Sequence, residues 1–466
     1  MSSVEALEQV TVAMSATEAV IGFVDALRHA ALSEEVRHYA KRHLLDTVGV
    51  MIAGAGGDVA TRAEAMLAAV RPAGHVVVPG RARRADLLDA AFLGGTAAHG
   101  IELDDGYRQG SVHPGCAVVP TLLALAQDRK IAGSTLIEAL VAGYETVTAI
   151  GRACHPELRQ RGYHPTGAVA VLGAAMAAGK LRSLPTRGLA NAFGLAASSA
   201  AGLFAFVGGG ADIKRLHAGH AAREGSQAAL LAEQGVEGPP RVLEARDGFL
   251  QTLAFGRASP RPIELPPAVP FGVTDCYIKP YPCCRHIQPA VEALIGLVTD
   301  EKIAADEITR IDVETYRIAA EHAETGWDDF ASAQLSFPYL MALAAKHRWI
   351  RLEHFAESER RDPALAALAA KVHVTAPPAI DKLYPSLRPA RVTLTSKRGA
   401  FVRQADEALG SRLVPLDDEG LKEKFMTLVG PALGCDSAAR LIEQLWAIEQ
   451  VDDAGALVVT MARQPA

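Results

Sequence analysis

The first 255 residues or so are dominated by apolar residues at helical spacing. After Ser33, for example, Val36, Ala40, Leu44 and Val48 recur every three or four residues. This period places apolar side chains on one face of an α-helix, and serine is a preferred N-cap. A helix from Ser33 should end at Gly54–Gly57, and further helices are predicted over about 59–71, 85–103, 117–129, 133–153, 166–182, 187–205 and 218–234.

The pattern changes near residue 256. Seven prolines fall between Ala258 and Pro282, and proline interrupts helices. Beyond them, helical and β-rich segments alternate before the helical period returns. Helices are predicted over about 286–299, 330–346, 416–430 and 436–449, and strands over 307–317, 371–375 and 390–396. We expect a mostly α fold, with a large all-helical domain (1–257 and 411–466) and a smaller α+β lid domain (258–410).

Composition narrows the class of protein. Hydrophobic residues make up 49% of the 466 residues and charged residues 21%, and 47 basic against 53 acidic residues give a net charge of −6. An acidic chain without a basic face is a poor candidate for binding nucleic acid. The N-terminus lacks the pattern of a secretory signal, and the longest apolar stretch, Thr166–Gly179, is too short to span a membrane. We expect a cytoplasmic protein whose six cysteines are reduced.

Titratable residues gather in four short segments, the first of which is His99–Gly115. If a helix continued to Asp105, then His99, Glu102 and Asp105 would share one face. A helix end with solvated carboxylates explains this segment equally well. A divalent metal held by the carboxylates and His113 is a weaker alternative, because the spacing matches no specific metal motif. We expect no metal.

The second and third segments open apolar helices. Arg161 and His164 stand before the first of these, where free N–H groups can bind an anion. Lys214 and His217 precede the second. A helix cap and a solvated basic face are the structural alternatives.

The fourth segment, Tyr277–His286, falls at the predicted domain crossing, a favoured place for small-molecule sites. It contains Lys279, Arg285 and His286. Its Cys-x6-Cys-Cys spacing matches no common iron–sulfur motif, so packed thiols are expected instead. Together the four segments concentrate cations and imidazoles in an acidic chain. Such groups suit a substrate with several carboxylates and a reaction that builds negative charge on carbon.

The same segments resemble the MmgE/PrpD family, which includes 2-methylcitrate dehydratase, cis-aconitate decarboxylase and iminodisuccinate epimerase. The similarity extends over most of the chain, in order and spacing. It rests on HLLDTVGVMIAG (43–54), H-x-x-[DE]-x-D-D (99–105) with HPG (113–115), YHPTGAVAVLGAA (163–175), KRLHAGHAAREG (214–225), YIKPYPCCRHIQPAVEAL (277–294) and QLSFPYLMALA (334–344).

The resemblance implies a helical domain with an α+β lid, a homodimer, and catalysis without metal, nucleotide or iron–sulfur cofactor. It places His113, His164, Lys214, Lys279 and Tyr339 where decarboxylase-type members carry active-site groups. Two positions depart from those members. Glu102 stands where they carry Asp, and Gly106 where they carry Thr, so one hydroxyl is absent.

These expectations combine into a cofactor-independent lyase or isomerase that moves a proton beside a carboxylate of a small polycarboxylic acid. His113 or His164 is the base, Lys214 and Lys279 neutralise carboxylates, and Tyr339 and Glu102 assist proton transfer. Dehydration of the 2-methylcitrate type or isomerisation is slightly favoured over decarboxylation because of Glu102 and Gly106. A non-catalytic binding protein is the alternative from another class. The predicted substrate-binding residues are Asp105, Arg161, His217, Arg285 and His286.

Overall fold

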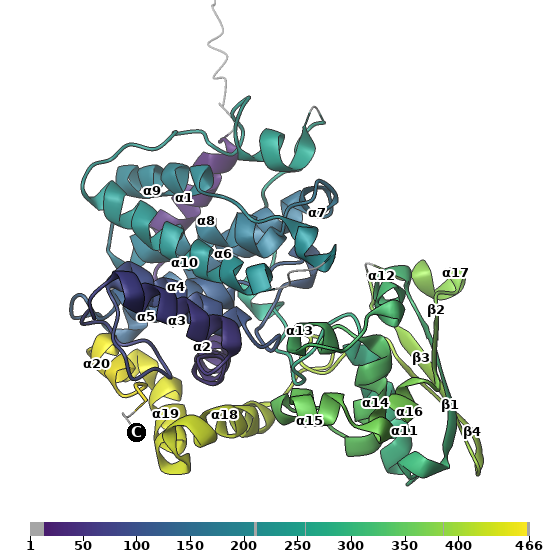
Figure 1. Cartoon of the computed structure of the whole chain (residues 1–466). Coiled ribbons are helices and arrows are strands. Elements are labelled where there is room, and N and C mark those ends of the chain that lie inside the picture. Colours follow the sequence, from purple (N-terminus) through teal and green to yellow (C-terminus); the bar gives the residue numbers. More distant parts are fainter. Residues whose placement is uncertain (1–13, 209–211, 257, 385, 464–466) are drawn as a thin grey trace, which may run out of the picture.

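The computed structural model describes residues 14–208, 212–256, 258–384 and 386–463. Residues 1–13, on which the expectation of no export signal rests, lie outside this part. Figure 1 shows a larger helical part beside a smaller part that contains a four-stranded sheet. The predicted fold class, mostly α with a smaller α+β domain, is confirmed. The boundaries at residues 257 and 411 stay a prediction.

The large domain begins as its apolar pattern predicts. The Ser33 side chain accepts a hydrogen bond from the Val36 N–H and so caps α2, which ends at Gly54. The helices of this domain are α1 (Ala16–Ala26), α2 (Glu34–Gly54), α3 (Asp58–Val70), α4 (Leu87–His99), α5 (Gly115–Leu125), α6 (Gly133–Cys154), α7 (Glu157–Gln160), α8 (Pro165–Leu181), α9 (Thr186–Ser198) and α10 (Asp212–Glu233).

Small residues let the central helices of this domain approach closely. A Cβ on Gly225 of α10 would lie 2.5 Å from the Cβ of Ala174 of α8. Every residue from Pro165 to Gly179 is buried, so the longest apolar stretch is a core helix. In the described part of the chain no single helix has the length and composition of a membrane span. The pair α2 and α3, bent by 72°, meets that criterion only when taken together.

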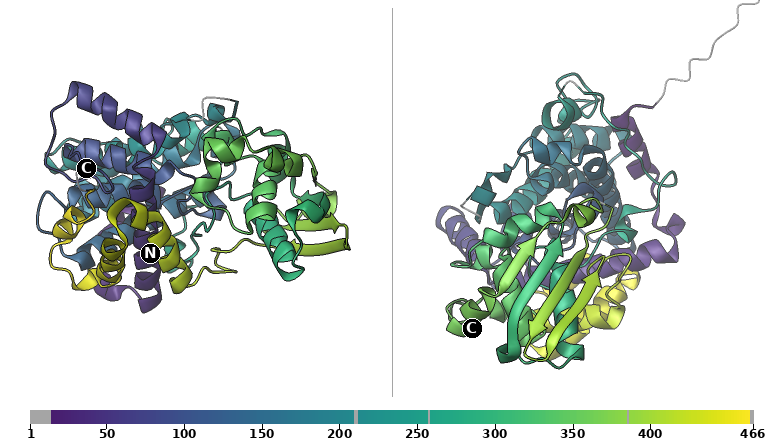
Figure 2. Two further views of the ribbon diagram at one scale, coloured as in Figure 1. Left: turned by 60° about the horizontal axis from the view of Figure 1, so that its bottom comes forward. Right: turned by 90° about the vertical axis from the view of Figure 1, so that its right-hand side faces the viewer.

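The α+β domain has a hydrophobic core of its own, to which α11 and α14 contribute. Its strand order is β2-β1-β3-β4, with β2 parallel to β1 and the other pairs antiparallel. Helices cover one face of the sheet, and the other face points away from the large domain (Figure 2). The elements are α11 (Gln288–Asp300), β1 (Ile308–Thr315), α12 (Arg317–Ala320), α13 (Phe330–Ala333), α14 (Phe337–His347), α15 (Glu357–Arg360), α16 (Pro363–Ala369), β2 (Val372–Thr375), α17 (Pro378–Asp381), β3 (Ala390–Ser396) and β4 (Gly399–Ala405).

The last helices return to the large domain (Figure 1). They are α18 (Asp418–Leu433), α19 (Cys435–Trp446) and α20 (Ala454–Val459). Both α18 and α19 pack against α2. Residues of α18 and α19 therefore share one core with α2 and α6.

Four element predictions were wrong in detail. The helix predicted to reach residue 103 or 105 ends at His99, and the one predicted to reach 205 ends at Ser198. The helix predicted over 330–346 breaks at Ser336, one residue before α14 begins. The basic residues of the third segment lie inside α10 rather than before it. Strand β4, residues 399–405, was not predicted.

Candidate active site

The loop that follows α4 carries the acidic residues of the first segment. The helix stops at His99, and in the loop that follows Glu102 has a left-handed backbone with φ of 56°. Such a conformation costs about 1 kcal/mol or more for a residue other than glycine. Two backbone hydrogen bonds between Gly106 and Tyr277 then tie the loop to the fourth segment. The first and fourth segments are thereby brought together.

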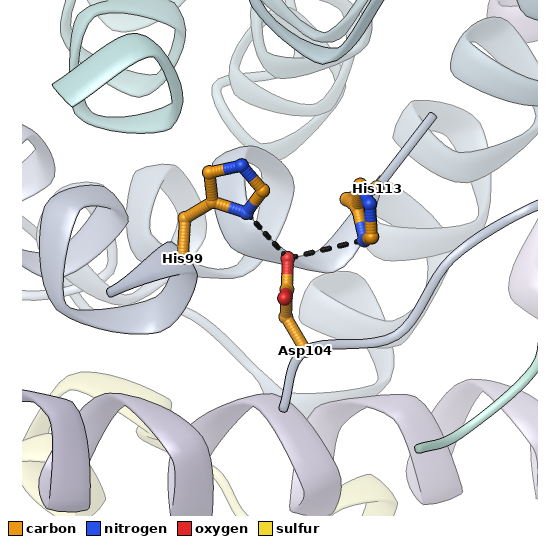
Figure 3. A group of neighbouring side chains, drawn as sticks. All are labelled: His99, Asp104 and His113. Carbon is orange, nitrogen blue, oxygen red and sulfur yellow. Dashed lines mark hydrogen bonds and ion pairs between the residues drawn. The ribbon is translucent and has the colours of Figure 1, made fainter. Parts of the chain in front are cut away.

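Asp104 lies between two histidines (Figure 3). Its Oδ2 is 2.7 Å from His99 Nδ1 and 3.2 Å from His113 Nδ1. Although burial raises the pKa of Asp104, His113, His99 and Lys279 together hold it well below its usual range. An ionised carboxylate only accepts hydrogen bonds, so His99, which is hydrogen-bonded to Asp104, carries its proton on Nδ1. The close contact of His113 Nδ1 with the same carboxylate favours the same tautomer.

The backbone reinforces this orientation of His113, because its Nδ1 also lies 2.5 Å from the carbonyl oxygen of Asp105. Burial lowers the pKa of His113, and it lowers the pKa of His99 to about 4 despite the opposing effect of Asp104. Both rings are neutral at pH 7. The Nε2 lone pair of each is thus available to accept a proton.

Two lysines approach the same loop from other parts of the chain. Lys214, in the first turn of α10, forms an ion pair with Glu102. Lys279 Nζ is 3.3 Å from the other carboxylate oxygen of Glu102 and 3.7 Å from Asp104 Oδ1. Burial and the charge of Lys279 lower the pKa of Lys214. Glu102 therefore links two lysine side chains that the sequence separates by 65 positions (279 − 214).

A second histidine pair borders this network. His164 is the N-cap residue of α8, and its Nδ1 lies 3.0 Å from Nδ1 of His217. Burial lowers the pKa of both rings, that of His217 to about 4, so one neutral ring donates and the other accepts. The His99 and His164 rings stack with centroids 5.7 Å apart. We call Glu102, Asp104, Lys214, Lys279, His99, His113, His164 and His217 the lysine–histidine cluster.

Asp105 was predicted to bind substrate, but its side chain contacts the protein scaffold instead. Its side chain accepts hydrogen bonds from the Tyr144 hydroxyl at 2.7 Å and the Gly115 N–H at 3.0 Å. His43 Nδ1 lies 3.0 Å from the same carboxylate. This fully buried carboxylate is engaged by the scaffold, while the Asp105 carbonyl orients His113.

The structure does not bring Tyr339 or Arg161 to the cluster. Tyr339 is fully buried in the core of the α+β domain and donates a hydrogen bond to the His354 carbonyl at 2.7 Å. Arg161 donates to the Thr252 carbonyl at 2.9 Å. Both roles remain predictions that these contacts do not support.

Arg285 and His286 lie beside Lys279 but face other partners. The Arg285 guanidinium donates to the carbonyls of Ala408 and Leu409 and packs over the Tyr277 ring, 4.7 Å from its centroid. His286 Nδ1 lies 2.6 Å from the Tyr316 hydroxyl. Neither residue has a direct contact with the lysine–histidine cluster among the described interactions.

His99 and Asp104 are the site residues that sequence reasoning left out of its assignments. Both belong to the H-x-x-[DE]-x-D-D element, so a signal was present. The assumed helix, however, placed His99, Glu102 and Asp105 together and turned Asp104 away. Only the left-handed turn at Glu102 brings Asp104 rather than Asp105 against His99.

The donor atoms of His99, Asp104 and His113 lie within 4.8 Å of one another, close enough for a metal ion. His99 Nδ1 is hydrogen-bonded to Asp104, and His113 Nδ1 is hydrogen-bonded to the carbonyl oxygen of Asp105. The Lys279 ammonium, 3.7 Å from Asp104 Oδ1, would also repel a cation. These contacts favour a proton-transfer network over a metal centre.

The fold, a helical domain with an α+β domain, and a buried site of lysines and histidines define a class of enzyme that handles small anions. Comparison with known proteins identifies the family to which the chain belongs. The sequence profile of the MmgE/PrpD N-terminal domain matches residues 18–261, and that of the MmgE/PrpD C-terminal domain matches residues 281–450. The chain belongs to the MmgE/PrpD family, and the curated relatives that it matches are lyases.

The curated relatives include proteins named cis-aconitate decarboxylase. The Mus musculus protein is 27% identical over 95% of this chain and 92% of its own length. The Homo sapiens protein is 28% identical over 96% and 94%. The Aspergillus terreus protein is 24% identical over 89% of each chain.

Proposed function

We propose that the lysine–histidine cluster catalyses proton transfer beside a carboxylate of a small polycarboxylic acid, without a cofactor. The observation that carries this proposal is the meeting of Lys214, Lys279, Asp104 and His113 in one buried network. Removing a proton from such a carbon places a second negative charge beside a carboxylate. Preorganised cations and donors in a buried site oppose that cost, each by about 3–4 kcal/mol in favourable cases.

Lys214 and Lys279 are suited to bind the substrate carboxylate. In the described structure Glu102 holds both lysines, so it occupies the position that an incoming carboxylate needs. We expect the substrate to displace Glu102 from at least one lysine. The released carboxylate then lies next to the reacting carbon and can take part in proton transfer.

His113 is better placed than His164 to act as the base. Its side chain is 15% exposed, and because its Nδ1–H is directed at the Asp105 carbonyl, Nε2 is left to accept a proton. His164 is only 3% exposed, and its Nδ1 is engaged by His217. A neutral imidazole in hydrogen-bond reach of the substrate contributes about 10²–10⁴-fold to the rate.

The reaction itself can be dehydration, epimerisation or decarboxylation, because all three use this set of groups. The relatives named above make cis-aconitate the first substrate to test. The glycine at position 106 favours testing other substrates as well. A Cβ at this position would lie 2.3 Å from the Tyr277 hydroxyl, so Tyr277 fills the space that a threonine side chain would use. The site therefore differs in shape from one that carries threonine, which supports a substrate of its own.

The cluster is closed in this structure, since Lys279 is 1% and Glu102 6% exposed. A cavity of about 410 Å³ lies between the two domains and is bordered by Leu103 and Pro280, but none of the cluster's side chains lines it. We therefore propose that the α+β domain acts as a lid that opens to admit substrate. Small-angle scattering with and without citrate should show a more compact particle when citrate is bound.

The test of the proposed function is a panel of cis-aconitate, 2-methylcitrate and iminodisuccinate, incubated with the wild type and His113→Ala. Ultraviolet absorbance follows a new C=C bond, and proton NMR follows CO₂ loss or exchange of carbon-bound hydrogen in D₂O. We expect turnover of one of these acids and a fall of at least about 100-fold in the folded variant. Equal turnover by the variant would reject the role of His113, and no reaction with any polycarboxylate would reject the function.

A further inference from the structure

A small cavity of about 110 Å³ lies between the two domains, apart from the lysine–histidine cluster. The loop that follows α4 and the chain before Tyr277 form one wall, and the region between α17 and α18 forms the other. The charged side chains around it are four arginines and two carboxylates. They are Arg108, Arg285, Arg388, Arg412, Asp275 and Glu407.

These side chains leave the cavity positively charged. Four guanidiniums against two carboxylates give a net charge of +2 (4 − 2), and arginine stays protonated in proteins. Glu407 is already paired with Arg108, and Asp275 accepts a hydrogen bond from Gln109 at 3.2 Å. Arg285 is bonded to carbonyls and to Gln288 rather than to a carboxylate. The excess charge is therefore not balanced within the cavity.

The guanidinium of Arg388 is a buried charged group without an anionic partner among the described side chains. The residue is only 5% exposed, and among the described interactions its guanidinium makes no hydrogen bond or ion pair. Its Nε is buried without any acceptor. A buried charged donor left unpaired costs several kcal/mol, so such a group normally faces a ligand or a counterion.

We propose that this cavity is a binding site for a small oxyanion, a phosphate or a short dicarboxylate, distinct from the proton-transfer site. Planar guanidiniums bind both groups through paired N–H donors. Arg108 belongs to the large domain and Arg388 to the α+β domain, so one bound anion contacts both domains. The anion would stabilise this arrangement of the two domains.

The experiment titrates inorganic phosphate, and in a separate arm succinate, into the full-length protein by calorimetry at constant ionic strength set with chloride. Wild type, Arg388→Gln and Lys279→Gln are compared after circular dichroism has verified the fold of each. We expect saturable binding to wild type and to Lys279→Gln, and binding at least about tenfold weaker to Arg388→Gln. The stronger ligand of the two arms identifies the class of anion.

Arg412→Gln provides a second variant in case the buried Arg388→Gln does not fold. Arg412 is exposed, and its side chain makes one hydrogen bond, to Thr274 Oγ1 at 3.2 Å. It should also weaken binding of the anion. Binding lost in Lys279→Gln and unchanged in the arginine variants would assign the anion to the cluster and overturn the proposal. So would the absence of saturable binding to wild type. Neither result depends on which reaction the enzyme performs.

Discussion

At the residue scale, the site depends on which groups are charged at neutral pH. Burial lowers the pKa of His99, His113, His164 and His217, so these rings are neutral. The pKa of Asp104 is lowered as well, so this carboxylate is ionised. If His113 is the base, its activity is lost only when the pH falls through its lowered pKa. Turnover should therefore persist below pH 6.5, the ordinary value for histidine. A rate profile that already declines above pH 7 on its acid side would contradict this assignment.

Cys284 is a second residue whose protonation can be tested. Its Sγ is 3.7 Å from His322 Nε2, and although burial raises the pKa of the thiol, His322, the His286 N–H and Lys279 bring it down to about 7. The thiolate fraction, and with it the rate of alkylation by iodoacetamide, should rise as the pH rises through about 7. His322→Gln should move this curve to higher pH. Mass spectrometry of the labelled peptide measures the rate.

The neighbouring Cys283 is the internal control for this prediction. It is fully buried, and burial raises its pKa to about 12, whereas Cys284 is 8% exposed. Cys283 should stay unmodified under conditions that label Cys284. Equal labelling of the two cysteines would show that Cys284 is not the more reactive thiol. No effect of His322→Gln would show that His322 does not lower the pKa of Cys284.

Gly106 offers a prediction about packing beside the site. A methyl group there would meet the Tyr277 hydroxyl at 2.3 Å, so Gly106→Ala forces the ring to move. We expect a loss of about 1–3 kcal/mol in the free energy of unfolding, with a smaller loss in a Tyr277→Leu background. Gly22→Ala, in α1 with nothing within 4 Å, should be neutral or slightly stabilising. Denaturant unfolding measures the wild type, the two single variants at Gly106 and Tyr277, their double variant and Gly22→Ala.

At the scale of the elements, α18 supports the loop that carries the site. Lys424 of α18 donates to Asp46 of α2 at 2.5 Å and to the carbonyl of Leu103 at 3.0 Å. Leu103 stands between Glu102 and Asp104, so the half-buried Lys424 holds the backbone of both neighbours in place. Sequence reasoning predicted that the last helices return to the first domain, but not this contact. Lys424 lies within an ordinary amphipathic helix, where nothing in the pattern distinguishes it from a surface lysine.

Removing one partner of this pair should therefore be costly. Burial raises the pKa of Asp46 and lowers that of Lys424, and each charge offsets the shift of the other. We expect Asp46→Ala to reduce the free energy of unfolding by about 3–5 kcal/mol, because it leaves an unpaired buried ammonium. The double variant Asp46→Ala/Lys424→Met should recover part of this loss. Additive effects in denaturant unfolding would show that the pair is not coupled.

At the scale of the whole molecule, the sequence predicted most of the architecture and only part of the site. The helical period and the proline-rich segment were enough to predict a helical domain and a smaller α+β domain. The period follows from burial of apolar side chains, and the effect of proline follows from backbone sterics. Each of the four segments contributes at least one residue to the cluster, through His113, His164, Lys214 and Lys279. The left-handed turn at Glu102 and the unpaired Arg388 could not be predicted, because each depends on packing between distant segments.

The last prediction concerns catalysis without a metal. Three donor groups lie close enough for an ion, yet Asp104 already accepts a hydrogen bond from His99, lies 3.2 Å from His113 Nδ1 and faces the Lys279 ammonium. Chelation with EDTA followed by gel filtration should leave turnover of the acid identified in the panel unchanged within error. Added Zn²⁺ should inhibit, because it competes with the protons on His99 and His113. Loss of turnover on chelation, restored by one divalent metal, would instead assign these three residues to a metal centre.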